Sequence, residues 1–539
     1  MGRGRLDRVR KMKSSPASQP GHSLTTAQRR YFYFTAAVTG AAIMVIEVLG
    51  AKMLAPYVGT SHFVWMAQIV VTMVALACGY YIGGRWVDRS RGPGGLYVGI
   101  LVAALYLCVA ATQVARVANA CVKFDLAIGA LLASTFLFLV PLLLLATTAP
   151  FLIRFLMLSV QNVGGAVGRL TAVSTVGSIV GTVVIGYVLI PLLANSTILL
   201  VTAGVLLLVA TIYFAIWGNR RGLQAAALVL ASGLLCGYVS ESGGLAKNDT
   251  FEELYRHNTS FGTLQVVQVR AQPRRLLLTD YLPQAFYDFE RHQSLSAFAP
   301  TLHGLAWTYT RGISNALCIG LGGGLVPMEL VREGTKVDVV EINPAVSPIA
   351  RKYFELDTNG MNLIVGDGRP FVKQSREKYD AIVLDAFLGD ATATHLFTKE
   401  AFAEMSRVLR PQGVLVINCF GGPAPGTEFS VASIHRTLTA VFRGVSAFSR
   451  SVAGDVSNVY FIASPSELTV QRQMDFAKVH PYCRQEVTDI FSMPVQFDSD
   501  HGIVLTDDYN PIEFYDAANR EKVRRGMVEF MQCVMVAQH

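Results

Sequence analysis

Residues 316–324 read Ala-Leu-Cys-Ile-Gly-Leu-Gly-Gly-Gly, and residues 337–342 read Val-Asp-Val-Val-Glu-Ile. The first stretch is an apolar run that ends in glycines, as a buried strand does where it turns tightly into a helix. The second is another strand-like run, and it places Glu341 about 20 residues beyond Gly320, where a carboxylate can accept hydrogen bonds from ribose hydroxyls. Together the two stretches predict an α/β domain that binds a nucleoside.

The strand and helix patterns continue to alternate downstream. Further strands are expected at Leu363–Val365, Tyr379–Asp385, Val414–Phe420 and Val459–Ala463, with helices at 325–333, 344–354, 398–409 and 430–442. This alternation predicts a mostly parallel, doubly wound, Rossmann-like sheet of the S-adenosylmethionine-methyltransferase type, whose ligands lie at the carboxyl ends of the strands.

Several chemically useful residues fall at that predicted edge. Gly320, Gly322 and Gly323 allow the backbone to approach a ligand, while Asp367-Gly368 and Asp385 follow the third and fourth strands. Asp367 could accept from an adenine amino group, and Gly368 would leave room for the ring. The competing interpretations are a solvated strand-end acid at position 341, a simple turn at 367–368 and a loop cap at 385.

The region before this domain predicts a small antiparallel sheet. Residues 263–269 and 275–278 are rich in β-formers, and the chain after Gln284 is expected to be helical to about residue 310. The expected organisation is a basic segment (1–30), a transmembrane domain (31–240), a linker (241–259), a small sheet with a helix (260–311), the Rossmann-like domain (312–515) and a tail (516–539).

The N-terminal half is too apolar for an ordinary soluble domain. The chain is 52% hydrophobic and 16% charged, and a membrane-spanning helix needs about 20 apolar residues. Suitable windows lie at 33–57, 62–84, 95–115, 126–153 and 222–240, and the charge-free run 170–219 holds two more around Pro191 and Asn195. Seven spanning helices are therefore expected, in a multi-pass protein of the cell membrane.

Basic residues indicate how this bundle is oriented. They cluster in the first 30 residues, at Arg85–Arg91, at Arg154 and Arg169, and at Arg220-Arg221, which are alternate ends of the spans. This pattern places the N-terminus in the cytoplasm. Seven crossings would put the chain after residue 240 on the far side, whereas one further crossing within 126–160 would return it to the cytoplasm.

The net charge and the cysteine pattern indicate which binding partners and metal sites to expect. The net charge of +8 comes largely from the basic N-terminus and one set of loops, which favours anionic lipid over nucleic acid. The eight cysteines form no C-x-x-C pair, so neither a zinc site nor another metal site is expected. Glu47 lies inside an apolar span, where it either pairs with Lys52 or Arg85 or serves a transport role.

The motifs resemble those of the spermidine synthase (polyamine aminopropyltransferase) family. The matching stretches are Cys-Ile-Gly-Leu-Gly-Gly-Gly (318–324), Val-Val-Glu-Ile-Asn-Pro (339–344), Gly-Asp-Gly-Arg (366–369) and Leu-Asp-Ala-Phe (384–387), within a similarity over roughly 260–465. Residues 54–61, 78–85, 172–182 and 505–513 resemble the membrane-embedded branch of that family.

The resemblance implies transfer of an aminopropyl group from decarboxylated S-adenosylmethionine to an amine such as putrescine, with release of methylthioadenosine. It implies that Glu341 binds the ribose, Asp367 and Gly368 bind the adenine, and Asp385 is the catalytic base. Asp280 and Asp390 would supply negative charge for a polycationic substrate, and Gln284 would also contact it. The nucleoside sulfonium is a co-substrate and no prosthetic group is implied, while a homo-oligomer is compatible with the sequence.

The chain departs from the family at three places, one of which is that the usual Asp-Pro does not follow the catalytic Asp, since Asp385 is followed by Ala386-Phe387. It has Gly323 where the family usually carries an Asp in the glycine loop, and Arg291-His292-Gln293-Ser294 near the position of the Tyr-His-Glu segment. An S-adenosylmethionine-dependent methyltransferase, which binds a donor that keeps its carboxylate, is therefore a second hypothesis. A third is a non-catalytic membrane transporter or sensor whose soluble domain binds an adenosyl ligand.

Overall fold

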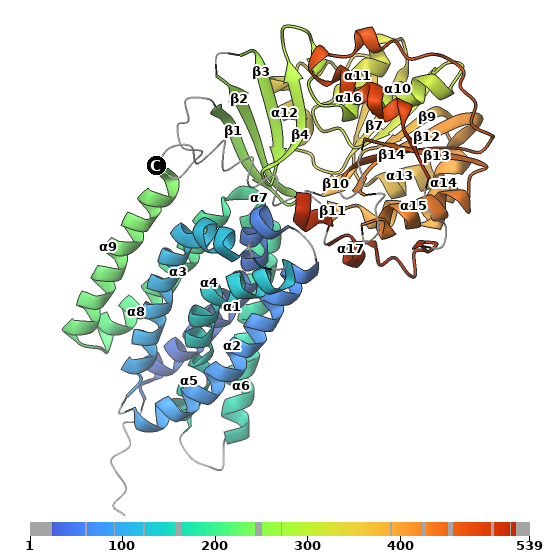
Figure 1. The fold of residues 1–539 in the computed structure, drawn as a ribbon. Helices are drawn as coiled ribbons and strands as arrows, with labels where there is room; N and C mark the ends of the chain where they lie inside the picture. Colours follow the sequence, from blue (N-terminus) through green and yellow to red (C-terminus); the bar gives the residue numbers. More distant parts are fainter. Residues whose placement is uncertain are drawn as a thin grey trace, which may run out of the picture.

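The computed structural model describes residues 24–523, apart from 60–61, 91, 122–123, 125, 158–162, 243–250, 271, 389–390, 423–426, 451–455, 497–500 and 518. Most of the predicted basic segment, part of the predicted linker and most of the predicted tail lie outside these residues. A helical bundle forms the N-terminal half, and a five-stranded sheet with an α/β domain forms the C-terminal half (Figure 1).

The bundle consists of long apolar helices. They are α1 (Thr26–Val58), α2 (His62–Arg89), α3 (Gly94–Cys121), α4 (Leu126–Ala146), α5 (Thr148–Leu156), α6 (Val163–Val184), the π-helix Ile185–Leu189, α7 (Ile190–Leu192), α8 (Asn195–Ile216) and α9 (Arg220–Ser242). The described residues contain seven helical stretches long and apolar enough to cross a membrane, with α4–α5 and α6–α7 each counted once. This number agrees with the sequence prediction.

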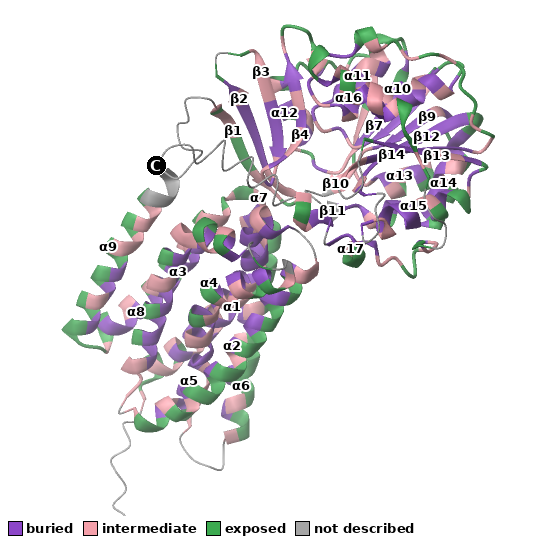
Figure 2. Ribbon diagram, in the orientation of Figure 1, coloured by how far each residue is buried: buried purple, intermediate pink, exposed green. Residues whose placement is uncertain are grey.

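Apolar side chains cover the outside of the bundle as well as its core. Large hydrophobic residues such as Ile179, Leu208 and Leu228 are exposed on its outer faces (Figure 2). A helix that is apolar on all sides suits a lipid surrounding better than water.

The small sheet is an antiparallel meander with the order β1-β2-β3-β4-β5. Its strands are β1 (Phe251–Thr259), β2 (Gly262–Val269), β3 (Arg274–Thr279), β4 (Leu282–Asp288) and β5 (Gln293–Ser294). Two expectations from the sequence were wrong here. Residues 251–259 form a strand rather than linker because they pair along β2, and the segment after Gln284 continues as β4, with α10 (Phe298–Tyr309) beginning only at Phe298.

The main sheet has eight strands in the order β15-β13-β14-β12-β9-β6-β7-β8. The strands β6 (Asn315–Ile319), β7 (Lys336–Glu341), β8 (Met361–Val365), β9 (Tyr379–Leu384) and β12 (Leu409–Gly421) are parallel. The sheet continues through antiparallel pairs, from β12 to β14 (Ser457–Ser464), from β14 to β13 (Gly444–Ser449) and from β13 to β15 (Pro494–Val495). The chain order reverses between β6 and β9, which is where ligands bind in doubly wound sheets. This is the expected Rossmann-like, methyltransferase-type architecture.

Helices cover the two faces of the main sheet (Figure 1). They are α10, α11 (Leu325–Arg332), α12 (Val346–Tyr353), α13 (Gly368–Gln374), α14 (Lys399–Val408), α15 (Phe429–Thr439) and α16 (Pro481–Ser492). The short helix α17 (Ile512–Tyr515) packs against α15, and β10 (Phe387–Leu388) and β11 (Ala391–Thr392) form a separate hairpin. The described start of the predicted tail is not loose. Asp516 and Arg520 are buried and form an ion pair with a 3.2 Å Nε–Oδ2 distance, which fixes this segment against α15.

The bundle contacts the C-terminal half at the end of α1 and the start of α2. Lys52 Nζ donates a 2.7 Å hydrogen bond to the carbonyl of Ser260 in the β1–β2 turn. The backbone N–H of His62 donates to Glu513 Oε1 at 3.0 Å, and the Tyr57 and Tyr281 rings lie 6.2 Å apart. Three separate segments of the C-terminal half therefore rest on one end of the bundle.

Candidate active site

A cavity of about 1170 Å³ opens along the carboxyl edge of the main sheet and extends beside the small sheet. Gly320, Gly322, Glu341, Asp367, Gly368, Asp385 and Gln284, all predicted from the sequence, are among its lining residues. Gly323 lines a smaller recess of about 20 Å³ behind the glycine loop. The structure thus brings together residues from the ends of four strands and from β4 of the small sheet.

The turn after β6 requires glycine at position 320. Gly320 has φ of 101°, and a Cβ built on it would lie 2.1 Å from the carbonyl oxygen of Asp385. The backbone N–H of Asp385 also donates to the carbonyl of Ile319 at 3.0 Å. The backbones of the glycine loop and of Asp385, the candidate catalytic base, therefore contact each other directly, at the point where the strand order reverses.

Glu341 at the end of β7 is tied to this loop. Its Oε2 accepts a 2.9 Å hydrogen bond from the backbone N–H of Leu321, and its Oε1 accepts one of 2.8 Å from Asn343 N–H. Burial raises the pKa of the Glu341 carboxyl, and backbone N–H donors, including those of Asn343 and Leu321, oppose that shift. The carboxylate is held in place before any ligand arrives, since two backbone donors fix its orientation.

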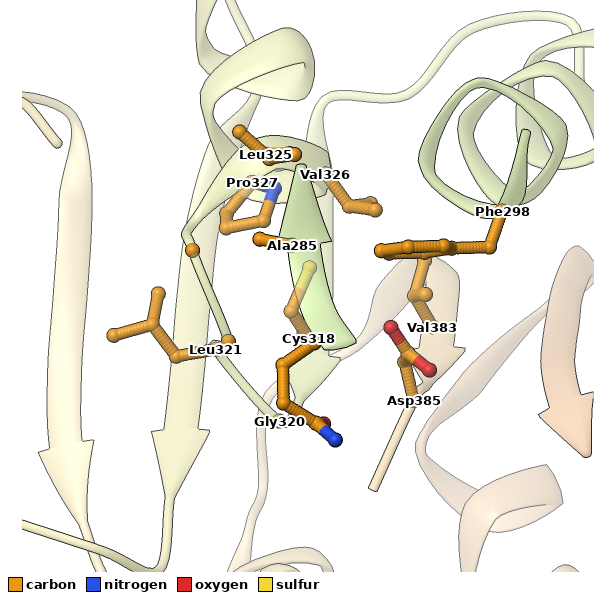
Figure 3. Close-up of a pocket in the computed structure, with 13 residues that line it drawn as sticks. Ala285, Phe298, Cys318, Gly320, Leu321, Leu325, Val326, Pro327, Val383 and Asp385 are labelled. Carbon is orange, nitrogen blue, oxygen red and sulfur yellow. The ribbon is translucent and has the colours of Figure 1, made fainter. Parts of the chain in front are cut away.

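Asp385 extends from the end of β9 into the cavity (Figure 3), where its carboxylate points into the space between Gly320 and Phe298. Its Oδ1 accepts a 2.9 Å hydrogen bond from Nδ2 of Asn418 on β12, and Asn418 accepts one of 2.7 Å from Asn458 on β14. Burial raises the pKa of Asp385, and the Asn418 amide partly opposes this shift. A carboxylate with a raised pKa in a cleft is suited to accept a proton.

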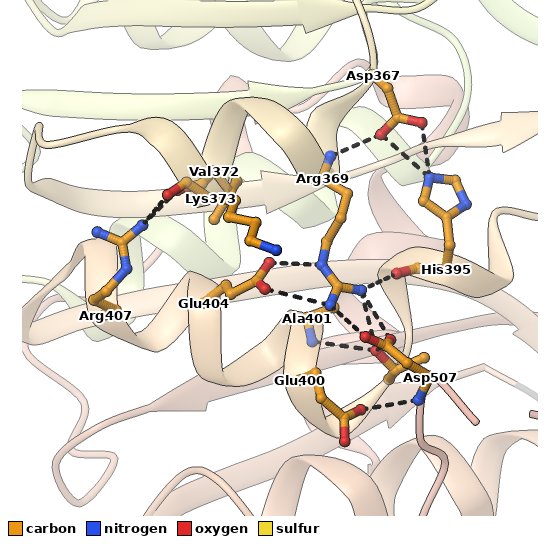
Figure 4. A network of polar contacts seen from close by, with 11 residues as sticks. Asp367, Arg369, Val372, Lys373, His395, Glu400, Ala401, Glu404, Arg407 and Asp507 are labelled. Carbon is orange, nitrogen blue, oxygen red and sulfur yellow. Dashed lines mark hydrogen bonds and ion pairs between the residues drawn. The ribbon is translucent and has the colours of Figure 1, made fainter. Parts of the chain in front are cut away.

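Asp367 caps the N-terminus of α13 and belongs to a wider polar network (Figure 4). Its Oδ1 accepts a 2.8 Å hydrogen bond from the N–H of Arg369, and His395 Nε2 lies 3.1 Å from its Oδ2. Arg369 continues the network to Glu404 and Asp507, at 2.6 and 2.9 Å. Asp367 is therefore the N-cap of α13, a role not predicted from the sequence, while its carboxylate still lines the cavity.

Of the two acidic residues predicted to attract a polycationic substrate, Asp280 is the one that the structure describes, and it does not line the cavity. Asp280 is buried in the β3–β4 turn, where its Oδ1 accepts a 2.9 Å hydrogen bond from Thr263 N–H, and it is not among the described residues that line the cavity. Asp390 lies outside the described residues.

Sequence reasoning missed several lining residues. Asn418 and Tyr460 come from β12 and β14, Glu486 from α16, and Arg520 from the segment predicted as tail. A polar residue inside the apolar run Val414–Phe420 was the one available signal for Asn418, because a buried amide needs a hydrogen-bond partner. Arg520 gave no such signal.

Among the residues that the structure describes, no group of three or more His, Cys, Asp or Glu side chains is arranged to hold a metal ion.

Residues 297–471 match the sequence model of the spermine/spermidine synthase domain. Over 291 residues the chain is 30% identical to an N-terminal histidine N-methyltransferase of Emericella nidulans, covering 49% of this chain and 51% of that protein. It is 37% identical over 135 residues to a polyamine aminopropyltransferase of Vibrio vulnificus, covering 24% and 42%. The chain spans about half the length of these curated relatives.

Among solved structures, a probable spermidine synthase from Corynebacterium glutamicum aligns with a TM-score of 0.35 and 16% identity, covering 42% of this chain and 83% of that one. The fold assignment comes from the strand order described above. The sequence matches support a transferase-type domain in the C-terminal half.

Proposed function

Because the C-terminal half of this chain is spermidine synthase-like, we propose that it is an aminopropyltransferase. It transfers the aminopropyl group of decarboxylated S-adenosylmethionine to an amine such as putrescine and releases methylthioadenosine. The observation that carries this proposal is the convergence of Glu341, the glycine turn and Asp385 on one cavity.

The reaction requires only a general base and correct positioning of the substrates by the protein. An amine attacks the carbon beside the sulfonium, the C–N bond forms as the C–S bond breaks, and the neutral thioether leaves without needing an acid. Asp385 takes the proton from the incoming ammonium, and Glu341 holds the ribose so that nitrogen, carbon and sulfur are aligned. Asn418 orients Asp385 from the neighbouring strand.

The direct test is release of methylthioadenosine by the purified full chain, supplied with decarboxylated S-adenosylmethionine and putrescine. Release that depends on both substrates is the expected result. Tight nucleoside binding without turnover on any amine would instead favour a non-catalytic sensor.

A methyltransferase is the second candidate, and one observation favours it. The similarity to the histidine N-methyltransferase covers more of this chain than does the similarity to the Vibrio aminopropyltransferase. Gly323, in place of the family Asp, also removes a partner for the ammonium of the decarboxylated donor. Calorimetric titration with both donors separates the hypotheses, because an aminopropyltransferase should bind the decarboxylated donor more tightly.

We further propose that the bundle spans the cell membrane with the N-terminus in the cytoplasm. Arg89, Arg154 and Arg220 lie at helix ends on the side away from the C-terminal half, which agrees with the excess of positive charge expected of cytoplasmic loops. Protease accessibility of the C-terminal half in sealed vesicles tests this arrangement. With a cytoplasmic N-terminus and seven crossings, the C-terminal half lies outside and should be cleaved in right-side-out spheroplasts, whereas protection would place it in the cytoplasm.

A further inference from the structure

The stretch 505–513, Leu-Thr-Asp-Asp-Tyr-Asn-Pro-Ile-Glu, contacts the elements that form the cavity, although none of the described lining residues belongs to it. Leu505 is fully buried, and its carbonyl accepts a 2.8 Å hydrogen bond from the N–H of Lys399 at the start of α14. At the other end, Glu513 accepts the backbone N–H of His62 from the bundle. Both ends of the stretch are therefore fixed.

Asp507, in the middle of this stretch, holds the guanidinium of Arg369 through two hydrogen bonds (Figure 4). Arg369 Nη2 donates to Asp507 Oδ2 at 2.9 Å, and Nη1 donates to Oδ1 at 3.1 Å. The hydroxyl of Thr398, the N-cap of α14, donates to the same Oδ1 at 2.6 Å. A two-point pairing fixes both the plane and the direction of a guanidinium group. Asp507 therefore sets the position of Arg369.

Arg369 in turn contacts both segments at the Asp367 end of the cavity. Its backbone N–H donates to Asp367 Oδ1 at 2.8 Å, and its Nη1 donates to the carbonyl of His395 at 2.6 Å. The side chains of Asp367 and His395 both line the cavity, with 3.1 Å between Oδ2 and Nε2. One arginine thus joins Asp367 to the turn that carries His395.

Asn510 fixes the same turn at a second point. Its Nδ2 donates a 2.8 Å hydrogen bond to the carbonyl of Thr394, the residue before His395. The turn is a 3₁₀ helix of only three residues, Thr394–Leu396, and such short helices have poor internal hydrogen-bond geometry. Side chains from outside the turn therefore hold two successive carbonyls of the segment that brings His395 and Leu396 to the cavity.

On the basis of the proposed function, in which Asp367 binds the adenine of the donor, we propose that Asp507 and Asn510 are positioning residues of the adenine site. They hold Asp367 and the 394–396 turn in the arrangement that the base requires. Binding groups must be fixed to within about 0.5 Å of the productive geometry. Loss of either contact should loosen the adenine site, while Glu341, which is held by the glycine loop, keeps its place for the ribose.

The test measures calorimetric binding of methylthioadenosine and methylthioinosine to the full chain in detergent. The two nucleosides differ at position 6 of the base, where adenine has an amino donor and hypoxanthine has a carbonyl acceptor. A carboxylate can accept from the amino group but is repelled by the carbonyl oxygen. The unmodified chain should therefore bind methylthioadenosine at least tenfold more tightly than methylthioinosine.

Asp507→Asn removes the charge that holds Arg369, and Asn510→Asp removes the donor that holds Thr394. Each substitution should lower the ratio of the two affinities at least threefold. A residue with a general structural role would instead weaken the binding of both nucleosides equally. Because the two substitutions break different contacts, either variant tests the inference if the other does not fold.

Asp508→Asn is the matched control. Asp508 follows Asp507 directly, is exposed, and forms no side-chain hydrogen bond or ion pair with the residues that the structure describes. Its affinity ratio should stay within about twofold of that of the unmodified chain. Equal binding of the two nucleosides by the unmodified chain, or an unchanged ratio in the folded variants of Asp507 and Asn510, overturns the inference alone. If the unmodified chain binds neither nucleoside, the proposed function fails as well.

Discussion

The side-chain amide of Asn418 donates a 2.9 Å hydrogen bond to Oδ1 of Asp385, and this contact joins β12 to the end of β9. Asn458 on β14 holds Asn418 in turn. The amide can donate to the carboxylate in its charged form, so it favours the state that a general base needs. One carboxylate oxygen is fixed in this way, and the second is available to an incoming amine.

Replacing Asn418 with Ala should move the acid limb of the pH–rate profile to higher pH. The reason is that the lost hydrogen bond favours charged Asp385, so its pKa rises further above the ordinary range. The measurement is kcat/KM for methylthioadenosine release across pH. Asn458→Ala should shift the acid limb in the same direction but by less, because Asn458 acts on Asp385 only through Asn418. If the acid limb stays in place in both variants, Asn418 does not control the pKa of Asp385.

Asp385→Asn should lower turnover by about 10² to 10⁴-fold, the usual contribution of a general base. Donor binding, measured by calorimetry, should be nearly unchanged because the ribose contact belongs to Glu341. Asp489→Asn on α16, where Asp489 is bonded to Gln485, controls for the loss of a carboxylate elsewhere. Turnover equal to that of the unmodified chain would remove Asp385 from the mechanism.

The unmodified chain should lose stability as pH rises between the ordinary pKa of an aspartate and the raised pKa of Asp385. The folded state binds the Asp385 proton more tightly than the unfolded state, so this contribution is fully present at lower pH and is lost through that interval. Thermal unfolding of the chain and of Asp385→Asn across pH provides the measurement. Identical pH dependence in both would show that burial does not perturb this group.

Gly323→Asp should fail to restore the family carboxylate. A Cβ at position 323 would lie 2.7 Å from Cβ of Ala285, so the loop or β4 must shift, at a cost of about 1–3 kcal/mol. The expected result is weaker binding of both donors and a lower melting temperature. Tighter binding of the decarboxylated donor would mean that the loop adapts, and Ala285→Gly in the same background tests whether the extra space rescues it.

Glu341→Gln should weaken donor binding by about tenfold to a hundredfold, since a hydrogen bond to a charged group contributes about 1.5–3 kcal/mol. The amide must also turn its NH₂ toward the N–H of Leu321 or Asn343, which disturbs the glycine loop. Calorimetry with the intact donor and with adenine alone separates the two effects. A loss confined to the ribose-bearing ligand identifies the carboxylate as the ribose contact.

The sheet and its binding edge were predictable because each parallel strand is a short apolar run followed by a glycine or acid, as at Gly320 and Glu341. The features that the sequence did not reveal depend on contacts between segments that are separate in the chain. β1 reads as a polar linker because three of its nine residues are exposed and none is fully buried, yet it pairs with β2 along its length. Asn418 acquires its role only through Asp385, which lies 33 residues away on a neighbouring strand and which no local pattern connects to it.

The C-terminal half contacts the bundle at Lys52, Tyr57 and His62, and these contacts constrain how substrates can reach the cavity. A domain attached by a linker alone would rotate freely relative to the bundle. Here the β1–β2 turn, the β3–β4 turn and α17 all contact the bundle, so the orientation of the domain is fixed. The cavity therefore keeps a fixed position relative to the bundle. If the bundle spans the membrane as proposed, molecules that diffuse within the membrane would reach the cavity more often than their bulk concentration implies.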